Sequence, residues 1–286
     1  MSAIDFIAQV IRIAVPYLFA AAGGVLAERS GIISLELEGF MLAGAFGGAV
    51  GSYATGSPWV GLACGLLGGL VFSLIHAVSC IRYKADQVVV GIAINLLAIG
   101  VTRFFLRLFF GSSSNSPRVV GFGDFLGFSS PLIPVGLLAI PLSWWVLTRT
   151  PFGLRIRAAG EHPGAARSVG VSVDRVRYLA VAASGMLAGL GGVYLAFDQH
   201  QFTDQMTAGR GYIAIAAVIF GSWKPIPAGL ACLLFAVAET AQIHMQGVGG
   251  IPSQFVAMIP YVLTIVALAG VVGRSLAPSA LGKPDA

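Results

Sequence analysis

Charged residues are scarce in this chain, and their scarcity excludes a soluble domain. Only 10% of its 286 residues are charged, whereas 57% are hydrophobic and the mean hydropathy is +0.87. Soluble domains carry about 25% charged residues, so the composition indicates an integral membrane protein. The 17 basic residues outnumber the 12 acidic ones, but they are scattered among apolar runs and form no basic face. Nucleic acid is therefore excluded as a partner.

Cysteine is also rare, and its three positions exclude most thiol chemistry. Cys64, Cys80 and Cys232 lie in apolar stretches, without the spacing or the clustered histidines that a disulfide framework or a metal site would need. The sequence motifs of phosphate-binding loops, zinc proteases and serine hydrolases are absent as well. We therefore expect no enzyme activity, no metal and no cofactor in this chain.

Long apolar runs are abundant. A helix needs about 20 apolar residues to cross a bilayer, and seven runs have about this length. They cover residues 4–27, 57–81, 87–110, 131–148, 176–198, 225–246 and 252–273. Two further segments are interrupted: residues 31–53 carry Glu36 and Glu38 near their start, and residues 208–223 open with a Gly-Arg-Gly sequence. We read the first run as a retained helix, because it has no basic leader and no small-residue cleavage site.

The basic residues predict how these segments are oriented. Residues 149–177 contain six arginines and two acidic residues, and short basic loops remain in the cytoplasm. If both interrupted segments cross, there are nine crossings with the N-terminus outside and the C-terminus cytoplasmic, and 12 bases lie inside against five elsewhere. If neither crosses, seven crossings leave nine bases inside against eight elsewhere. Nine crossings follow the rule better and are our prediction.

An internal repeat agrees with this topology. A shift of 168 positions aligns residues 23–25 with 191–193 and residues 61–64 with 229–232, and a shift of 167 aligns Gln87 with Gln254. The odd number of crossings between the halves predicts an inverted repeat with interrupted helices, as in many transporters; chance alignment of glycine-rich sequence is the alternative. We predict one all-α, polytopic transmembrane domain, residues 1–286, made of repeat 1 (about 10–110), a central helix (131–148), a cytoplasmic coupling loop (149–177) and repeat 2 (about 178–273).

Glycines four residues apart predict close packing between helices. The chain has 38 glycines, and pairs such as Gly44 and Gly48 or Gly185 and Gly189 would lie on one helix face. We interpret these pairs as packing positions rather than as chemistry.

Prolines and glycines recur at short intervals along the predicted coupling loop. Pro151, Gly153, Gly160, Pro163 and Gly170 divide it, which predicts a short helix over residues 163–168 between two turns. An ordinary solvated loop is the alternative interpretation.

Three segments carry a resemblance to a known family. The coupling loop resembles the segment by which permeases of the ribose, branched-chain amino acid and nucleoside group of ABC importers dock onto their ATPase. Residues 27–45 resemble the second-helix motif of that group, and residues 86–97 resemble the block that follows it in the nucleoside-type branch. The resemblance extends over about residues 10–275, and Glu36 stands where a small residue is more common in the group.

This resemblance implies a permease subunit of an ATP-driven importer in the bacterial cytoplasmic (inner) membrane. The implied solute is a nucleoside or a related sugar-containing compound. The implied partners are a second permease, with a related chain favoured over an identical copy, two ATP-binding cassette subunits that bind ATP and Mg, and a periplasmic or lipid-anchored solute-binding protein. The residues placed by the resemblance in the coupling element are Arg155, Arg157, Gly160, Glu161, His162, Pro163, Ala165, Ala166 and Gly170.

Polar residues inside the apolar runs are candidates for the substrate pathway, because a charge or an amide facing lipid is costly. Asn95 is about eight residues, or about 12 Å, into its run, which places it near the midplane. Each polar side chain could instead pair with a buried backbone group. The candidate pathway residues are Glu36, Glu38, Gly39, Gly91, Asn95, Glu239 and Gln242.

Three alternatives remain at this point. The permease could carry a different solute, such as a branched-chain amino acid or a vitamin precursor. An ion-coupled secondary carrier would also use an inverted repeat and intramembrane acids, although it has no need for a docking loop. A membrane enzyme is disfavoured, because the polar residues are scattered without an acid and base spacing.

Overall fold

The computed structural model describes residues 3–125, 127–245 and 277–283. Within these ranges the protein consists of ten α-helices and one π-helical turn, with two isolated β-bridges and no strand. The predicted all-α class is therefore confirmed. The first elements are α1 (Ala3–Arg29), α2 (Leu37–Thr55), α3 (Pro58–Ala77), η1 (Val78–Arg82), α4 (Gln87–Phe110) and α5 (Leu132–Arg149). They are followed by α6 (Pro151–Glu161), α7 (Pro163–Ser168), α8 (Val173–Asp198), α9 (Arg210–Phe220) and α10 (Pro225–Met245).

Six helices in the described ranges are long and apolar enough to cross a membrane: α1, α3 with η1, α4, α5, α8 and α10. The protein is thus a polytopic membrane protein. Each matches one of the predicted runs; the seventh run, residues 252–273, lies outside the described residues. The interrupted segments contain shorter helices. Residues 31–53 become helical only from Leu37, and α9 has 11 residues, about 16 Å of helix.

The coupling loop differs from its prediction in one respect. The short helix α7 covers residues 163–168 as predicted, but the turn expected before it is another helix, α6. Thr150 starts α6, because its hydroxyl accepts a hydrogen bond from the Gly153 N–H at 3.1 Å, and Pro151 occupies the first turn where no N–H is needed. The proline and glycine punctuation therefore marks helix ends and not loops.

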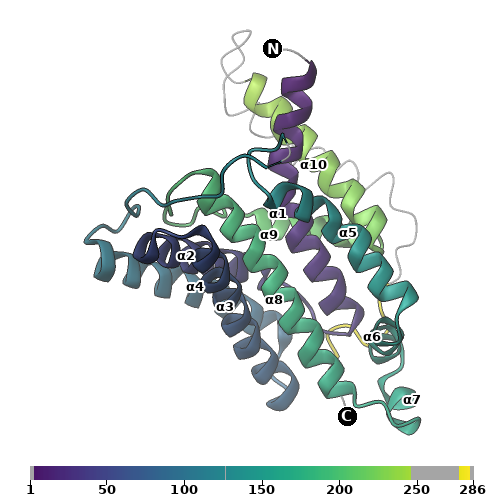
Figure 1. The fold of residues 1–286 in the computed structure, drawn as a ribbon. Coiled ribbons are helices and arrows are strands. Elements are labelled where there is room, and N and C mark those ends of the chain that lie inside the picture. Colours follow the sequence, from purple (N-terminus) through teal and green to yellow (C-terminus); the bar gives the residue numbers. More distant parts are fainter. Residues whose placement is uncertain (1–2, 126, 246–276, 284–286) are drawn as a thin grey trace.

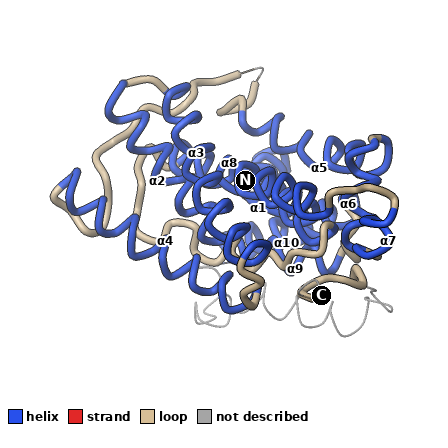
Figure 2. The backbone as a smooth tube through the Cα atoms, turned by 90° about the horizontal axis from the view of Figure 1, so that it is seen from below, coloured by secondary structure: helices blue, strands red, loops and turns tan. Residues whose placement is uncertain are grey.

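Helix α1 is the centre of the bundle. In its most apolar 18-residue stretch, 83% of the residues are buried, and it packs against α5, α8, α9 and α10. Figure 1 shows α1 running through the middle, with α2, α3 and α4 on one side and α5 and α10 on the other. Viewed from below, the same two groups lie on either side of α1 (Figure 2). The described tail, residues 277–283, lies at the end of the molecule opposite the N-terminus.

Glycines allow α2, α3 and α8 to pack at backbone distance. A Cβ on Gly44 of α2 would lie 2.4 Å from the Cα of Gly189 on α8, and a Cβ on Gly69 of α3 would lie 2.1 Å from the carbonyl oxygen of Gly185. The predicted packing role of the glycine pairs is confirmed for this three-helix layer, since no larger side chain fits at these positions.

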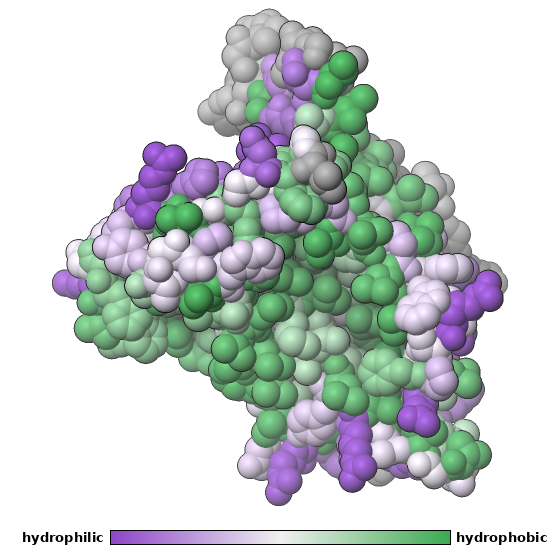
Figure 3. All heavy atoms as spheres, in the orientation of Figure 1, coloured by the Kyte–Doolittle hydropathy of each residue, from purple (hydrophilic) through white to green (hydrophobic). Residues whose placement is uncertain are grey.

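The outer surface is apolar over the body of the molecule. Figure 3 shows hydrophobic residues across its middle and hydrophilic ones gathered toward the ends. Helix α4 is among the most exposed, with only 28% of its apolar stretch buried. Its outward face carries Val89, Ile92, Leu96, Phe104 and Leu108, so this helix presents several large apolar side chains to lipid or to another protein.

Candidate functional site

The first turn of α9 is where several of the predicted pathway residues meet. The carboxylate of Glu38, in the first turn of α2, accepts a hydrogen bond from the Thr207 hydroxyl at 2.6 Å. It also accepts from the backbone N–H groups of Gly209 and Gly211, at 2.8 and 2.7 Å. A helix N-terminus leaves such N–H groups free and attracts negative charge. Glu38 therefore joins the start of α2 to the start of α9.

Asn95 connects α4 to the same place. Its Oδ1 accepts a hydrogen bond from the Gly39 N–H at 2.7 Å, and its Nδ2 donates to the Leu35 carbonyl oxygen and to the Tyr212 hydroxyl, each at 2.9 Å. The side chain is buried, and both amide protons and one oxygen lone pair are engaged. Gly39 is required for this approach, because a Cβ there would lie 2.8 Å from Oδ1. Asn95 thus ties the two interrupted segments to α4.

Glu239 reaches the start of α9 from the other side. Its carboxylate is hydrogen-bonded to the Tyr17 hydroxyl of α1 and lies 3.2 Å from an Nη2 of Arg210. The structure therefore brings Glu38, Gly39, Asn95 and Glu239 together around the first turn of α9, the α9 node. Gln242, almost one turn further along α10, is half-buried, and within the described ranges no hydrogen bond joins it to the node.

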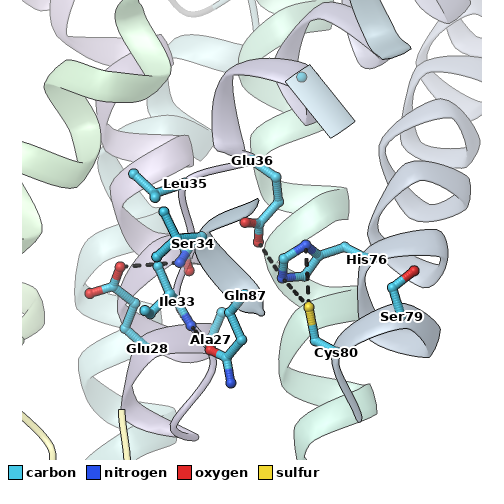
Figure 4. A network of polar contacts seen from close by, with 12 residues as sticks. Ala27, Glu28, Ile33, Ser34, Leu35, Glu36, His76, Ser79, Cys80 and Gln87 are labelled. Carbon is cyan, nitrogen blue, oxygen red and sulfur yellow. Dashed lines mark hydrogen bonds and ion pairs between the residues drawn. The ribbon is translucent and has the colours of Figure 1, made fainter. Parts of the chain in front are cut away.

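Glu36 lies apart from the α9 node and is the most isolated of the candidates. It is fully buried, and neither of its carboxylate oxygens has a hydrogen-bond partner in the described parts of the chain. Its Oε1 lies 3.4 Å from Nε2 of the equally buried His76, whose ring contacts the Cys80 sulfur (Figure 4). Gly91 gives it room, because a Cβ on Gly91 would lie 3.2 Å from Oε2. Glu36, with Gly91 beside it, is a second buried polar position between α2, α3 and α4.

A buried contact that the sequence did not single out lies on the other side of the α1–α2 connection. Glu28 accepts a hydrogen bond from the Ser34 N–H at 3.2 Å, as Figure 4 shows, and another from the Trp223 indole N–H. The neighbouring Arg29 donates from Nε to the Trp223 carbonyl oxygen at 2.7 Å. Trp223 adopts a left-handed backbone with φ of 57°, so α1 holds a strained turn between α9 and α10. The Glu-Arg pair was visible in the sequence, but its distant partner was not.

A polar cavity of about 490 Å³ opens beyond the α9 node, at the N-terminal end of α1. It is lined by charged and amide side chains from α1, α8 and α9, including Arg12 and Asp198, which form an ion pair at 2.9 Å. Arg210, which contacts Glu239, also lines it. Among the described residues, no group of three or more histidine, cysteine or acidic side chains is placed to hold a metal ion.

The coupling loop lies at the opposite end of the molecule, and part of it faces inward. Gly160 of α6 packs on the end of α1 so closely that a Cβ would lie 2.1 Å from the Arg29 carbonyl oxygen. Glu161 lies 3.6 Å from the Arg29 guanidinium, and Ala166 of α7 is buried. Ala280 of the C-terminal tail donates its N–H to the Gly160 carbonyl oxygen at 2.9 Å. These contacts fix α6 to the central helix and to the tail.

The remaining predicted coupling residues face outward or lie at the edge. Arg157 and Pro163 are half-buried; the exposed residues are Arg155, His162, Ala165 and Gly170. Val169, which the sequence argument did not select, is a 77% exposed apolar side chain beside them. Because Gly170 has a φ of 84°, it ends α7 with a left-handed turn and leaves Val169 projecting. The outward surface thus combines basic and apolar groups on a short, well-fixed helix pair.

Comparison with known proteins assigns the family. A profile described as "Branched-chain amino acid transport system / permease component" matches residues 6–268. The chain belongs to this family of ABC importer permeases. It is therefore a membrane-embedded transport subunit and not the ATPase, and membership implies an ATPase and a solute-binding protein as partners.

Three relatives indicate the branch of the family. The guanosine ABC transporter permease protein NupQ of Bacillus subtilis is 41% identical, over 95% of this chain and 93% of its own length. The nucleoside ABC transporter permease protein NupC of Lactococcus lactis subsp. cremoris is 36% identical, over 96% of this chain and 95% of its own length. The guanosine ABC transporter permease protein NupP of Bacillus subtilis is 24% identical, over 90% of this chain and 79% of its own length.

Proposed function

We propose that this permease carries a nucleoside, guanosine or a close analogue, into the bacterial cytoplasm. The observation that carries the proposal is the 41% and 36% identity to permeases named for guanosine and nucleosides, each over at least 95% of this chain. The polar cavity is compatible with such a solute, because carboxylates and guanidinium groups can bind ribose hydroxyls and ring nitrogens. Transport by the assembled importer would use ATP and Mg bound to the ATPase subunits.

The α9 node and the Glu36 position border the route of the solute in this proposal. Glu38 and Asn95 contribute by holding α2, α4 and α9 in place, since their hydrogen-bonding groups are already used within the protein. Tyr212 is the residue at the node with a donor to spare: the residue is 49% exposed, and its hydroxyl accepts from Asn95, which leaves its own O–H available to donate. Weak contacts of this kind allow a nucleoside to pass without being trapped. The proposed pathway residues are Glu36, Glu38, Gly39, Gly91, Asn95, Glu239 and Gln242.

The coupling loop transmits the motion of the ATPase. The contact surface lies on α6, α7 and the residues that flank α7. It consists of the exposed residues Arg155, His162, Ala165 and Gly170 together with the half-buried Pro163. The inward-facing residues of the loop are Gly160, Glu161 and Ala166. Because they pack on α1 and on the rest of the bundle, a displacement of α7 by the ATPase would be transmitted to the core. A solvated loop without packing contacts to the bundle could not transmit such a movement.

The topology in this proposal has nine crossings. The six long apolar helices, α2, α9 and the run at residues 252–273 supply them, with the N-terminus outside and the coupling loop and C-terminus in the cytoplasm. Support comes from the order of elements, since a long central helix, an irregular segment and a shorter helix occur twice, as α1 with α2 and as α8 with α9. The matching halves about residues 10–110 and 178–273 form the inverted repeat.

The second permease in the importer is a related chain. Two different relatives in Bacillus subtilis, NupQ and NupP, are both named as guanosine permeases. The exposed apolar side chains of α4 are suited to packing against a helix of the partner permease. The assembly would be completed by two ATPase subunits and an external, periplasmic or lipid-anchored, binding protein.

The experiment is ATP turnover by the reconstituted importer, measured with guanosine, with leucine and without solute. Stimulation by guanosine and its binding protein, but not by leucine, is the expected result. Stimulation by leucine alone would support the branched-chain amino acid alternative. Uptake without ATPase subunits would indicate an ion-coupled carrier.

A further inference from the structure

A basic pocket lies at the end of the bundle that carries the coupling loop. It has a volume of about 280 Å³ and lies where the ends of α1, α5 and α6 meet the start of α10. Its basic side chains are Arg29, Arg157 and Lys224, and its walls include Trp144 and Trp223. Here "the basic pocket" means this site.

The positive charge of the basic pocket is only partly balanced within the protein. Arg29 is 3.6 Å from Glu161 and donates to the Trp223 carbonyl oxygen. Arg157 has a buried Nε without a hydrogen-bond partner in the described ranges, and Lys224 is exposed. Arg157 and Lys224 both line the pocket, and neither forms an ion pair with a carboxylate among the described residues, so an anion that entered the pocket would meet two cationic side chains without an acidic partner.

The nearby acidic groups are already engaged. Glu161 also accepts hydrogen bonds from the backbone N–H and the hydroxyl of Ser279. Glu28 is on the other side of Trp223, where it binds the indole N–H and the Ser34 N–H. Neither carboxylate is thus placed to satisfy the Nε of Arg157, and the pocket retains an excess of positive charge.

The walls of the pocket favour a lipid as the source of that anion. Trp144 is 40% exposed on α5 and Ile226 is 41% exposed on α10, and both helices are long and apolar enough to cross a membrane. Tryptophan and basic side chains at the ends of such helices lie at the depth of the lipid headgroups. Basic pockets between membrane helices on the cytoplasmic side bind anionic headgroups. Acyl chains could then run along the apolar surfaces of α5 and α10.

We propose that the basic pocket binds the phosphate group of an anionic phospholipid, with Arg157 and Lys224 as its ligands and Trp144 beside the acyl chains. A phosphate ester presents several oxygen acceptors to a guanidinium and an ammonium group. A bound lipid at this place would touch α1, α5, α6 and α10 together, so the membrane composition would act directly on the base of the coupling loop.

The test measures lipid retained by the complex of permease and ATPase. The complex is placed in nanodiscs of equimolar phosphatidylcholine and phosphatidylglycerol, extracted, and analysed by native mass spectrometry for bound phosphatidylglycerol. The double variant Arg157→Gln/Lys224→Gln is compared with Arg82→Gln/Lys84→Gln. This matched control also removes one arginine and one lysine, both exposed near the end of η1 and neither of them part of the basic pocket.

The pocket variant is expected to retain at least about tenfold less phosphatidylglycerol than the wild type, because each basic group contributes separately to binding an anionic lipid. The control should retain as much as the wild type. Equal retention by all three proteins, or an equal loss in both variants, would overturn the proposal.

Two further arms test the source of the anion. Displacement of the lipid by inorganic phosphate at millimolar concentration would show that the site takes free phosphate and not lipid. Loss of ATPase binding by the pocket variant in pure phosphatidylcholine would show that an acidic side chain of the ATPase occupies it.

Discussion

Replacement of Asn95 by leucine tests the structural role of the α9 node. Leucine has a similar size but no polar atoms, so the variant loses the hydrogen bonds to Gly39, Leu35 and Tyr212, which measure 2.7, 2.9 and 2.9 Å. The Gly39 N–H and the Leu35 carbonyl would remain in the protein interior without Asn95. Each of these two groups costs about 1–3 kcal/mol when unpaired, so we expect a destabilisation of about 2–6 kcal/mol.

The matched variant is Tyr212→Phe. It removes only the hydroxyl at the exposed end of the chain of hydrogen bonds and leaves the Gly39 and Leu35 contacts of Asn95 intact. We expect its stability to stay within about 1 kcal/mol of the wild type. If Tyr212 contacts the solute, guanosine uptake falls nonetheless.

The assays are thermal unfolding of the purified protein and guanosine uptake by reconstituted vesicles. Asn95→Leu should lower both the unfolding temperature and the uptake, the latter at least about tenfold, while co-purification of the ATPase survives. An Asn95→Leu protein with wild-type unfolding and uptake would refute the role of the α9 node. Wild-type uptake by Tyr212→Phe would remove this hydroxyl from the pathway.

Three other predictions follow from the contacts described. Glu38→Gln should destabilise the protein by about 2 kcal/mol in chemical unfolding, since a carboxamide has one acceptor oxygen where the carboxylate of Glu38 uses two; unchanged stability would contradict a stabilising role for the hydrogen bonds between Glu38 and the start of α9. Gly160→Trp should abolish coupled transport while the protein still inserts, because even a Cβ would lie 2.1 Å from the Arg29 carbonyl oxygen, whereas Gly164→Trp, which has open space, should remain folded and lose only ATPase docking. Single cysteines at Asn115 and Ala165, on a cysteine-free background, should react with impermeant reagents from opposite sides of the membrane; labelling from one side would contradict the crossing by α5.

Local signals in the sequence predicted much of the fold, because they act over a few residues. The start of α4 at Gln87 could be read from the sequence, since Asp86 caps it by accepting from the N–H groups of Val88 and Val89. The bounds of α7 followed from the proline and glycine on either side. Helix α6 was missed, because the same punctuation was interpreted as a turn, although Thr150 and Pro151 are equally typical of a helix start.

The candidate site could be predicted only in part, because its contacts join residues that are far apart in the chain. Because a charge or an amide facing lipid is costly, the sequence correctly indicated that Glu38 and Asn95 would contact partners or water. No pattern in the sequence indicates that Glu38 binds the start of α9, about 170 positions away. The pairing of Glu28 with Trp223 escaped notice for the same reason. Glu36 was noticed as an unusual residue, and its isolation beside His76 becomes visible only when α2 and α3 are packed.

The central claim is ATP-driven import of a nucleoside, and the most direct measurement is uptake of radiolabelled guanosine by vesicles that contain the permease pair, the ATPase and the binding protein. We expect uptake that requires ATP, that unlabelled nucleosides inhibit, and that leucine does not affect. Uptake of leucine in place of guanosine, or guanosine uptake that persists without ATP, would contradict this account.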